Sequence, residues 1–398
     1  MPKNAVSLRR GSRMTDTNLL FLIAVCIFVV LYALAVFFLG GSFSKFQGFF
    51  DLLNNNATLL ILACGLSIVM VGGGIDISVG GVVAAVTAAC AVYLDSGAGG
   101  DVWLALCLAL GVGLAFGLVQ GFLVAYMGVQ PFIITLAGMF FARGLASVIT
   151  RYAYTVENES FLALKATKVK IDALGYTAPN GTLIPASLDI GVFVALFVII
   201  CVFVLLKWSR FGRNLYAVGG NSQSALMLGI NVKRTKFLSH LLCGLLAGIA
   251  GFVFLLKNGS GYAQHAMFFE MKAIAASIIG GTMLTGGVGN IIGSPIGILA
   301  LMTIETIVRA SGITTGGREF LQDITTGVML FLALVLQSVV LSRHSRGGGF
   351  KLVVPQWLKF GKGKGGDPEP LEQPEQPEQT EQTEQAEQAE QSPPPPPS

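Results

Sequence analysis

The sequence predicts an all-α membrane protein, a polytopic bundle of about ten transmembrane helices, and three observations support this fold class. Only 12% of the 398 residues are charged and 53% are hydrophobic, whereas soluble domains usually contain about 25% charged residues. Several apolar runs reach the roughly 20 residues that a helix needs to cross a bilayer. The 50 glycines are typical of membrane helices that pack closely through small residues.

The apolar runs define the expected spans. Residues 19–39 form a run longer than the roughly 7–15-residue core of a signal peptide, so we expect them to be retained as the first span. The further candidate spans are 57–72, 79–94, 103–127, 132–150, 189–206, 237–256, 270–286, 288–308 and 320–341.

Two basic segments predict the orientation of these spans. Residues 207–236 contain Lys and Arg but no Asp or Glu, and residues 343–365 are also basic. Because basic loops stay in the cytoplasm, both termini are predicted to be cytoplasmic and the polar segment 151–188 to lie outside. Eight spans would satisfy the same parity as ten.

The expected division of the chain follows from these runs. Residues 1–18 form a cytoplasmic N-terminal segment, 19–342 the transmembrane domain, and 343–365 a basic cytoplasmic segment. Residues 366–398 are rich in Glu, Gln and Pro, a composition that cannot bury a core, so we expect a disordered tail.

Two Gly-rich segments with similar sequences predict a pair of structural pseudo-repeats. Residues 72–81 read GGGIDISVGG and residues 280–289 read GGTMLTGGVG, each after an apolar run that is short for a full span. Short, Gly-interrupted helices in corresponding halves of a transporter indicate broken helices beside the substrate path. Tight interhelical turns at the cytoplasmic surface are the alternative. The path candidates in these segments are Gly73, Gly74, Asp76, Ser78, Gly280, Gly281 and Thr282.

Four polar residues at or near membrane depth complete the candidate path. Asp76 and Arg143 are ionisable, and such groups are costly inside a membrane and often functional. A buried Arg needs a partner, and Asp76 is the predicted one. The pair could contact the solute or gate the path, and the alternative is an ion pair that only holds two helices together. Gln120 and Gln130 could hydrogen-bond hydroxyl groups or link helices.

Two further charged pairs receive structural interpretations. Glu305 and Arg309 share a helix face because they lie four residues apart, so we expect a salt bridge near the outer end of their span. Glu270 and Lys272 stand at the start of a span, and we expect them to anchor it at the lipid headgroups.

The basic loop 207–236 contains a short helix with an apolar surface. Asn221 is suited to cap its start and Gly229 to end it. Between them, Ala225, Leu226, Met227 and Leu228 offer apolar side chains on a cytoplasmic loop, which favours docking of a soluble partner. The alternative is a helix that lies on the bilayer surface.

The sequence carries no sign of an enzyme. It contains no G-x-x-x-x-G-K-[ST] phosphate-binding loop, no catalytic triad and no zinc-ligand spacing. The six cysteines form no CxxC pair, which argues against disulfides and metal sites. No basic patch is interleaved with exposed aromatic residues, so no nucleic acid is expected as a partner. Any ATP-driven transport must therefore use an ATPase on another subunit.

Four stretches, in this order, resemble the sugar permease family of bacterial ABC importers, which includes ribose, xylose, arabinose and galactose permeases. They are GGIDISVG at 73–80, PFIITLAGMFFARG at 131–144, GRNLYAVGGN at 212–221 and GGTMLTGGVG at 280–289. The second stretch is most similar to galactofuranose-type and fructose permease subunits. The resemblance covers residues 15–345 and leaves the acidic tail unexplained.

The resemblance implies a permease subunit in the bacterial inner membrane that moves a monosaccharide, in a furanose form such as galactofuranose or fructose or a related pentose or hexose, into the cytoplasm. The partners it implies are an extracytoplasmic sugar-binding protein, a second, related permease chain and a cytoplasmic ATPase that docks on Asn221–Gly229. This chain would need no cofactor of its own, because ATP and Mg²⁺ are used by the ATPase. The alternatives are a branched-chain amino-acid ABC permease and an ion-coupled secondary transporter.

Overall fold

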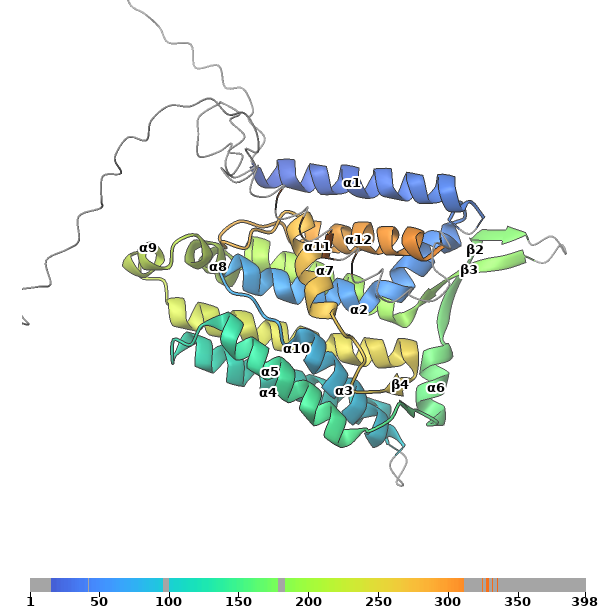
Figure 1. Cartoon of the computed structure of the whole chain (residues 1–398), viewed down its shortest axis with the longest axis horizontal. Coiled ribbons are helices and arrows are strands. Elements are labelled where there is room, and N and C mark those ends of the chain that lie inside the picture. The colour runs from blue at the N-terminus through green and yellow to red at the C-terminus, as the bar shows by residue number, and fades with distance from the viewer. Residues whose placement is uncertain are drawn as a thin grey trace, which may run out of the picture. The chain divides into compact units, whose positions relative to one another are not determined.

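The computed structural model describes residues 16–41, 43–95, 100–177 and 183–310, together with residues 324, 327, 328, 331 and 335. This part of the chain is mostly helical (Figure 1). Six helices in it are long and apolar enough to cross a membrane. They are α1 (Asp16–Leu39), α2 (Phe46–Val71), α4 (Val102–Ala125), α5 (Pro131–Ile149), α7 (Ile190–Trp208) and α10 (Val232–Asn258). The predicted helical membrane fold is confirmed, whereas the count of ten stays a prediction because most of the last run, 320–341, lies outside the described residues, as does the tail.

Three shorter helices complete the predicted runs: α3 (Val79–Leu94), α11 (Phe269–Ile279) and α12 (Gly293–Ala310). The expected spans 270–286 and 288–308 are wrong at their facing ends, because α11 already ends at Ile279 and α12 begins only at Gly293. Between α11 and α12 the chain leaves the helical conformation at its glycines, with Gly281, Gly286 and Gly287 all at positive φ, where residues with a side chain are strained.

The central helix is α2, in which every residue from Ala57 to Val71 is buried. It packs against α7, α10, α11 and α12. The prediction that the run before the first Gly-rich segment is short is wrong, because α2 begins at Phe46 rather than at 57. Its first turns carry polar side chains that lowered the mean hydropathy, and two of them, Asn54 and Asn56, are hydrogen-bonded within the fold.

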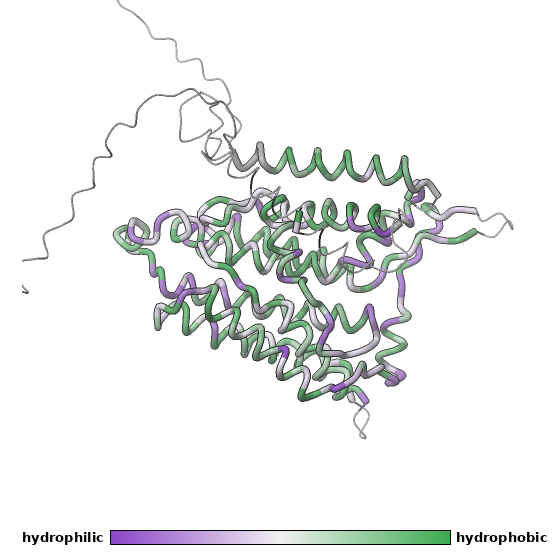
Figure 2. Tube along the Cα trace, in the orientation of Figure 1, coloured by the Kyte–Doolittle hydropathy of each residue, from purple (hydrophilic) through white to green (hydrophobic). Residues whose placement is uncertain are grey.

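The outward-facing surfaces of the outer helices α1, α4 and α5 are apolar. Few side chains of α1, α4 and α5 are buried, and Figure 2 shows hydrophobic residues along their length. A helix that is apolar all round must be buried or face lipid, so these exposed surfaces fit a bilayer.

The two ends of the bundle differ in structure (Figure 1). At the end where α7 begins lie α6 (Glu159–Ala166) and the antiparallel hairpin of β2 (Lys168–Thr177) and β3 (Leu183–Asp189), with Lys168 opposite Asp189. Nearby, β1 (Tyr154–Thr155) pairs with β4 (Ser260–Gly261). At the end where α7 finishes lie α8 (Arg210–Gly220) and α9 (Ser222–Met227). We call these the hairpin end and the α9 end.

Glycines bring α4 and α10 into backbone contact. A Cβ atom on Gly113 would collide with Gly244 O, and one on Gly244 would collide with Gly113 O. Gly117 and Gly248 meet the opposite helix in the same way. The predicted role of glycine in close helix packing is thus seen at this crossing, where small residues let two backbones approach.

We expect Gly113→Ala to destabilise the bundle by about 1–3 kcal/mol, the usual cost of overpacking a tight contact. Gly111→Ala is the matched control, because it lies on the same helix and a Cβ there meets nothing within 4 Å. The thermal unfolding midpoints of the two purified variants in detergent provide the measurement. Equal midpoints would show that the α4–α10 contact does not limit stability.

Candidate functional site

The α9 end presents the short helix predicted from the loop 207–236. Asn221 Oδ1 accepts a hydrogen bond from Ser224 N at 2.9 Å, which caps α9 as predicted. The helix ends at Met227, and Gly229 follows at φ +79°. Leu226 and Leu228 are 65% and 79% exposed. They form an apolar surface on a polar loop, as predicted.

Ala225 does not share in this surface. Its side chain is buried, and its carbonyl accepts a hydrogen bond from Ile230 N at 3.0 Å. Met227, the fourth apolar residue predicted for this helix, is 88% exposed. We call Leu226, Met227 and Leu228 the α9 surface.

The tips of the two Gly-rich segments meet directly beside α9. Gly287 N donates to Val71 O at 2.9 Å. A Cβ on Gly219, near the end of α8, would collide with Val71 O, and one on Gly286 would come too close to Gly73. The junction therefore requires glycines, and it joins both segments to the chain just before the α9 cap.

The first Gly-rich segment runs from this junction into the bundle, where Asp76 lies in a buried polar cluster. Asp76 Oδ1 accepts a hydrogen bond from Ser78 N at 2.9 Å and lies 2.6 Å from Ser78 Oγ. Ser78 Oγ is also 3.1 Å from Gln120 Oε1 on α4. His240 Nδ1 on α10 is 3.9 Å from Asp76 Oδ2. All four side chains are at least 97% buried.

This cluster unites three predicted path residues and adds one that sequence reasoning missed. Asp76, Ser78 and Gln120 were path candidates, whereas His240 was set aside because the three histidines are scattered along the chain. Its place in an apolar span opposite an intramembrane acid was the available signal. Gln130 is exposed on the turn between α4 and α5 and takes no part. Gly74 packs against the cluster through Val69 and His240 Nε2.

The second segment is built on the same plan but with a shorter preceding helix, α11. Gly280 packs against Gly293 so closely that neither could carry a side chain. Gly281 has φ +90°, and Thr282 is fully buried. The irregular backbone in both segments is thus enclosed by protein, the condition under which a membrane interior tolerates it.

Arg143 does not pair with Asp76, and that prediction is wrong. Its Nη1 donates to the carbonyls of Ala263 and His265 at 3.0 and 3.2 Å, and its Nη2 to that of Ala266 at 3.1 Å. A guanidinium carries five donors in a planar fork, which suits converging carbonyls better than the distant carboxylate. The turn that supplies them contains Ala266 at φ 53°.

The acids and bases around α11 are interior groups. Glu270 is only 4% exposed, lies against Gly80 and interacts electrostatically with Arg143. Lys272 Nζ is 2.9 Å from Glu305 Oε1. The expected headgroup anchor at Glu270 and Lys272 is therefore wrong, since neighbouring helices supply opposite charges. The predicted Glu305–Arg309 pair is present at 4.0 Å.

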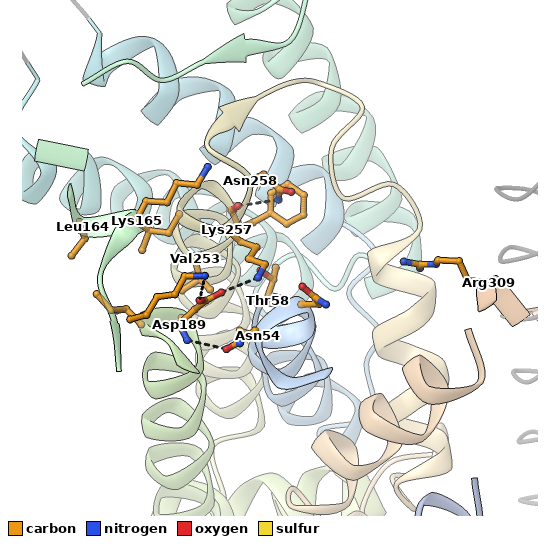
Figure 3. A pocket seen from close by; sticks show the side chains of 16 residues that line it. Asn54, Thr58, Leu164, Lys165, Asp189, Val253, Lys257, Asn258 and Arg309 are labelled. Atoms are coloured by element: carbon orange, nitrogen blue, oxygen red, sulfur yellow. Dashed lines mark hydrogen bonds and ion pairs between the residues drawn. The ribbon is translucent and has the colours of Figure 1, made fainter. Parts of the chain in front are cut away.

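The hairpin end contains two polar cavities that the sequence analysis did not predict. One, of about 370 Å³, lies among α2, α6, α7 and α10 (Figure 3), and the other, of about 380 Å³, lies among α2, α11 and α12. Asn55 and Arg309 line both. We call them the α10 cavity and the α12 cavity.

The wall of the α10 cavity is tied together by polar contacts. Asn54 Oδ1 accepts from Asp189 N at 2.9 Å, and Asn54 Nδ2 donates to Ser187 O at 3.1 Å. The Asp189 carboxylate is 2.8 Å from Lys257 Nζ and 3.4 Å from Lys168 Nζ. Figure 3 shows these side chains converging on the space between the helices.

The sequence signal for these cavities was the run Asn54-Asn55-Asn56 directly before an apolar stretch. Placing the start of the span at 57 put this run in a loop. Inside α2 it lies on a transmembrane helix, where neutral amides can hydrogen-bond across helices or to a polar solute. The path candidates named from the sequence do not line either cavity.

Comparison with known proteins adds independent information. A family model described as "Branched-chain amino acid transport system / permease component" matches residues 48–334. The inner membrane ABC transporter permease protein YjfF of Escherichia coli K12 is 34% identical over 326 residues, 81% of this chain and 93% of that protein. The fructose import permease protein FruG of Bifidobacterium longum is 32% identical, with 84% and 95% covered. The ribose import permease protein RbsC of Escherichia coli K12 is 31% identical, with 75% and 88% covered. No solved structure matches the chain.

Proposed function

This chain belongs to the family of ABC-transporter permease components that includes the ribose and fructose import permeases, and on this premise we propose that it is the membrane-spanning subunit of an ATP-driven monosaccharide importer. The resemblance to sugar permeases drawn from the four sequence stretches is confirmed by the matches. The observation that carries the proposal is the combination of this membership with an exposed apolar surface at one end of the bundle and polar cavities at the other.

In this proposal the two ends of the bundle lie on opposite sides of the membrane. The α9 end is cytoplasmic because the loop that contains α8 and α9 carries only basic charges. The hairpin end then faces the outside, where a sugar-binding protein delivers its load. With the predicted even number of spans, the N-terminus and the basic segment 343–365 would both lie in the cytoplasm.

A separate ATPase, which binds ATP and Mg²⁺, docks on the α9 surface. Three consecutive exposed apolar side chains are unfavourable in water and mark an interaction site. The glycine junction lies next to α9 in the chain and contacts both Gly-rich segments and, at Val71, the end of α2. A movement of α9 would therefore be passed directly to these segments. A second permease chain, related but different, completes the path.

The cavities at the hairpin end are the site at which we place the arriving sugar. Small-molecule sites occupy about 300–1,000 Å³ and use a few polar groups to orient the ligand, and both cavities fall in this range. The buried cluster of Asp76, Ser78, Gln120 and His240 lies toward the α9 end. There it either holds the first Gly-rich segment to α4 and α10 or opens onto the path in another state.

Competition for uptake tests the proposed substrate class against the branched-chain amino-acid alternative, which the description of the family model favours. Proteoliposomes would contain this chain, the second permease and the ATPase, with the binding protein outside. We expect unlabelled fructose, galactose or ribose to reduce uptake of the labelled sugar, and leucine in hundred-fold excess to leave it unchanged. Transport of leucine without transport of any sugar would overturn the sugar assignment.

A further inference from the structure

We propose, building on the proposed sugar-import function, that the α10 cavity binds a carboxylate and that the imported solute is a monosaccharide bearing one, a sugar acid. The cavity lies at the hairpin end, between the first half of α2 and the ends of α6, α7 and α10 (Figure 3). Three features of the cavity support this proposal: its charges, polar groups that make no hydrogen bond or ion pair with the described residues, and its size.

The charges lining the cavity are unbalanced. Four cations, Lys165, Lys168, Lys257 and Arg309, face one acid, Asp189, which leaves a formal charge of +3. A concave site with low-dielectric walls concentrates the potential of such charges. A neutral sugar gains little from this potential, whereas a carboxylate is attracted by it.

Two of the cations are already committed to Asp189. Lys168 and Lys257 lie 3.4 and 2.8 Å from its carboxylate. Arg309 Nη2 is 4.0 Å from Glu305, which Lys272 holds more closely at 2.9 Å. The Arg309 side chain is 56% exposed and lines the cavity from α12.

Lys165 is the least committed cation in the site. Its side chain is half-buried, and its Nζ lies beside Gly259 at the end of α10. Lys165 makes no hydrogen bond or ion pair with any residue that the structure describes. The end of α10 offers it a helix dipole, but a helix C-terminus carries only about half a negative charge. That is too little to neutralise a site of this charge.

Neutral groups in the cavity suit the remainder of a sugar. The Asn55 side chain is exposed and forms no hydrogen bond within the described part of the chain. Asn258 donates through Nδ2 to Phe254 O at 3.0 Å, which leaves its Oδ1 to accept from a hydroxyl. Phe254 adds an apolar ring to the wall. A volume of about 370 Å³ is within the range of small-ligand sites.

A carboxylate could also come from a side chain of the docked binding protein, and the experiment separates the two sources. The full-length chain in nanodiscs, without any other subunit, is titrated with labelled galacturonate and with galactose, which differ only at C6. We expect galacturonate to bind about ten-fold more tightly at low salt. This advantage should shrink as salt screens the charges.

Lys165→Gln tests the residue assignment. We expect it to weaken galacturonate binding about five-fold while galactose binding is unchanged. The matched control is Lys170→Gln, which removes an equal charge from the exposed part of β2 outside the cavity. Equal affinities for the two sugars in the parent chain would overturn the proposal, as would an unchanged preference in Lys165→Gln. A separate titration of the same nanodiscs with the sugar-binding protein distinguishes the second source: if Lys165→Gln weakens only that protein's binding, the carboxylate belongs to the binding protein and the proposal is overturned.

Failure of this inference is distinguishable from failure of the proposed function. If the assembled importer moves neutral sugars with ATP while the nanodisc titrations show no preference for the acid, the transport function stands and the acidic-solute assignment falls. If no sugar of either kind is moved, the proposed function itself falls.

Discussion

Arg143→Leu is expected to lower the yield of folded, monodisperse protein more than any other single substitution on α5. The substitution removes three hydrogen bonds to the turn before α11 and leaves Glu270 buried without its neighbouring cation. Each buried acceptor that loses its donor costs about 1–3 kcal/mol, and a buried charge that loses its partner costs more. The measurement is the thermal unfolding midpoint in detergent, together with the monodisperse fraction on gel filtration.

Arg309→Leu is the control for this prediction, because it also removes one arginine from the transmembrane domain. Arg309 is 56% exposed and its ion pair with Glu305 is long, at 4.0 Å, so its loss should shift the midpoint little. Arg143→Lys should fall between the two, since an ammonium keeps the charge but lacks the planar fork. Equal midpoints for Arg143→Leu and Arg309→Leu would contradict the assigned role of the carbonyl contacts.

Leu226→Asp is expected to abolish the complex with the ATPase while the permease still inserts and folds. The substitution places a charge in the α9 surface, where an apolar partner would have to bury it. Because Leu226 is 65% exposed, the isolated permease loses little packing. Co-purification of the ATPase with the tagged permease, followed by the ATPase activity of the pulled-down complex, provides the measurement.

Leu183→Asp is the matched control for the α9 surface. It makes the same change at a residue that is 53% exposed on β3, at the hairpin end. We expect the ATPase to co-purify with this variant as it does with the parent chain. Retention of the ATPase by Leu226→Asp, or its loss from both variants, would refute docking on α9.

The local features that the sequence predicted correctly depend on short-range rules. The cap at Asn221 and the turn at Gly229 need only the residues around them, and both were predicted. The Glu305–Arg309 contact follows from helix geometry alone. Glycine in close helix packing was expected as a class, although its place at Gly113 and Gly244 required the structure.

The partners of the interior charges could not be predicted in the same way. Arg143 was assigned to Asp76 because that was the available acid at membrane depth. In the fold, Arg143 instead donates to three backbone carbonyls. Every residue has a carbonyl, so a sequence does not show which ones will accept the hydrogen bonds. Lys272 pairs with Glu305, 33 residues further along the chain. Its predicted contact with lipid headgroups was wrong because the packing of α11 against α12 cannot be read from the sequence.

The cavities illustrate a third kind of omission. The run Asn54 to Asn56 stands directly before the predicted span. It was left out of the span because polar residues lower the mean hydropathy of a segment. Once α2 is extended to Phe46, the same residues stand on a transmembrane helix beside α7 and α10. Their contribution to a cavity also depends on Asp189 and Lys257, which are more than 100 residues away in the chain.

Uptake by reconstituted subunits, omitted one at a time, tests the central claim most directly. Proteoliposomes with both permeases and the ATPase would receive ATP inside and binding protein with labelled sugar outside. The account predicts uptake in the complete system and background levels when ATP, the ATPase or the binding protein is left out. Uptake by this chain alone, driven by a sodium or proton gradient, would contradict it and would make the buried Asp76 the first residue to replace.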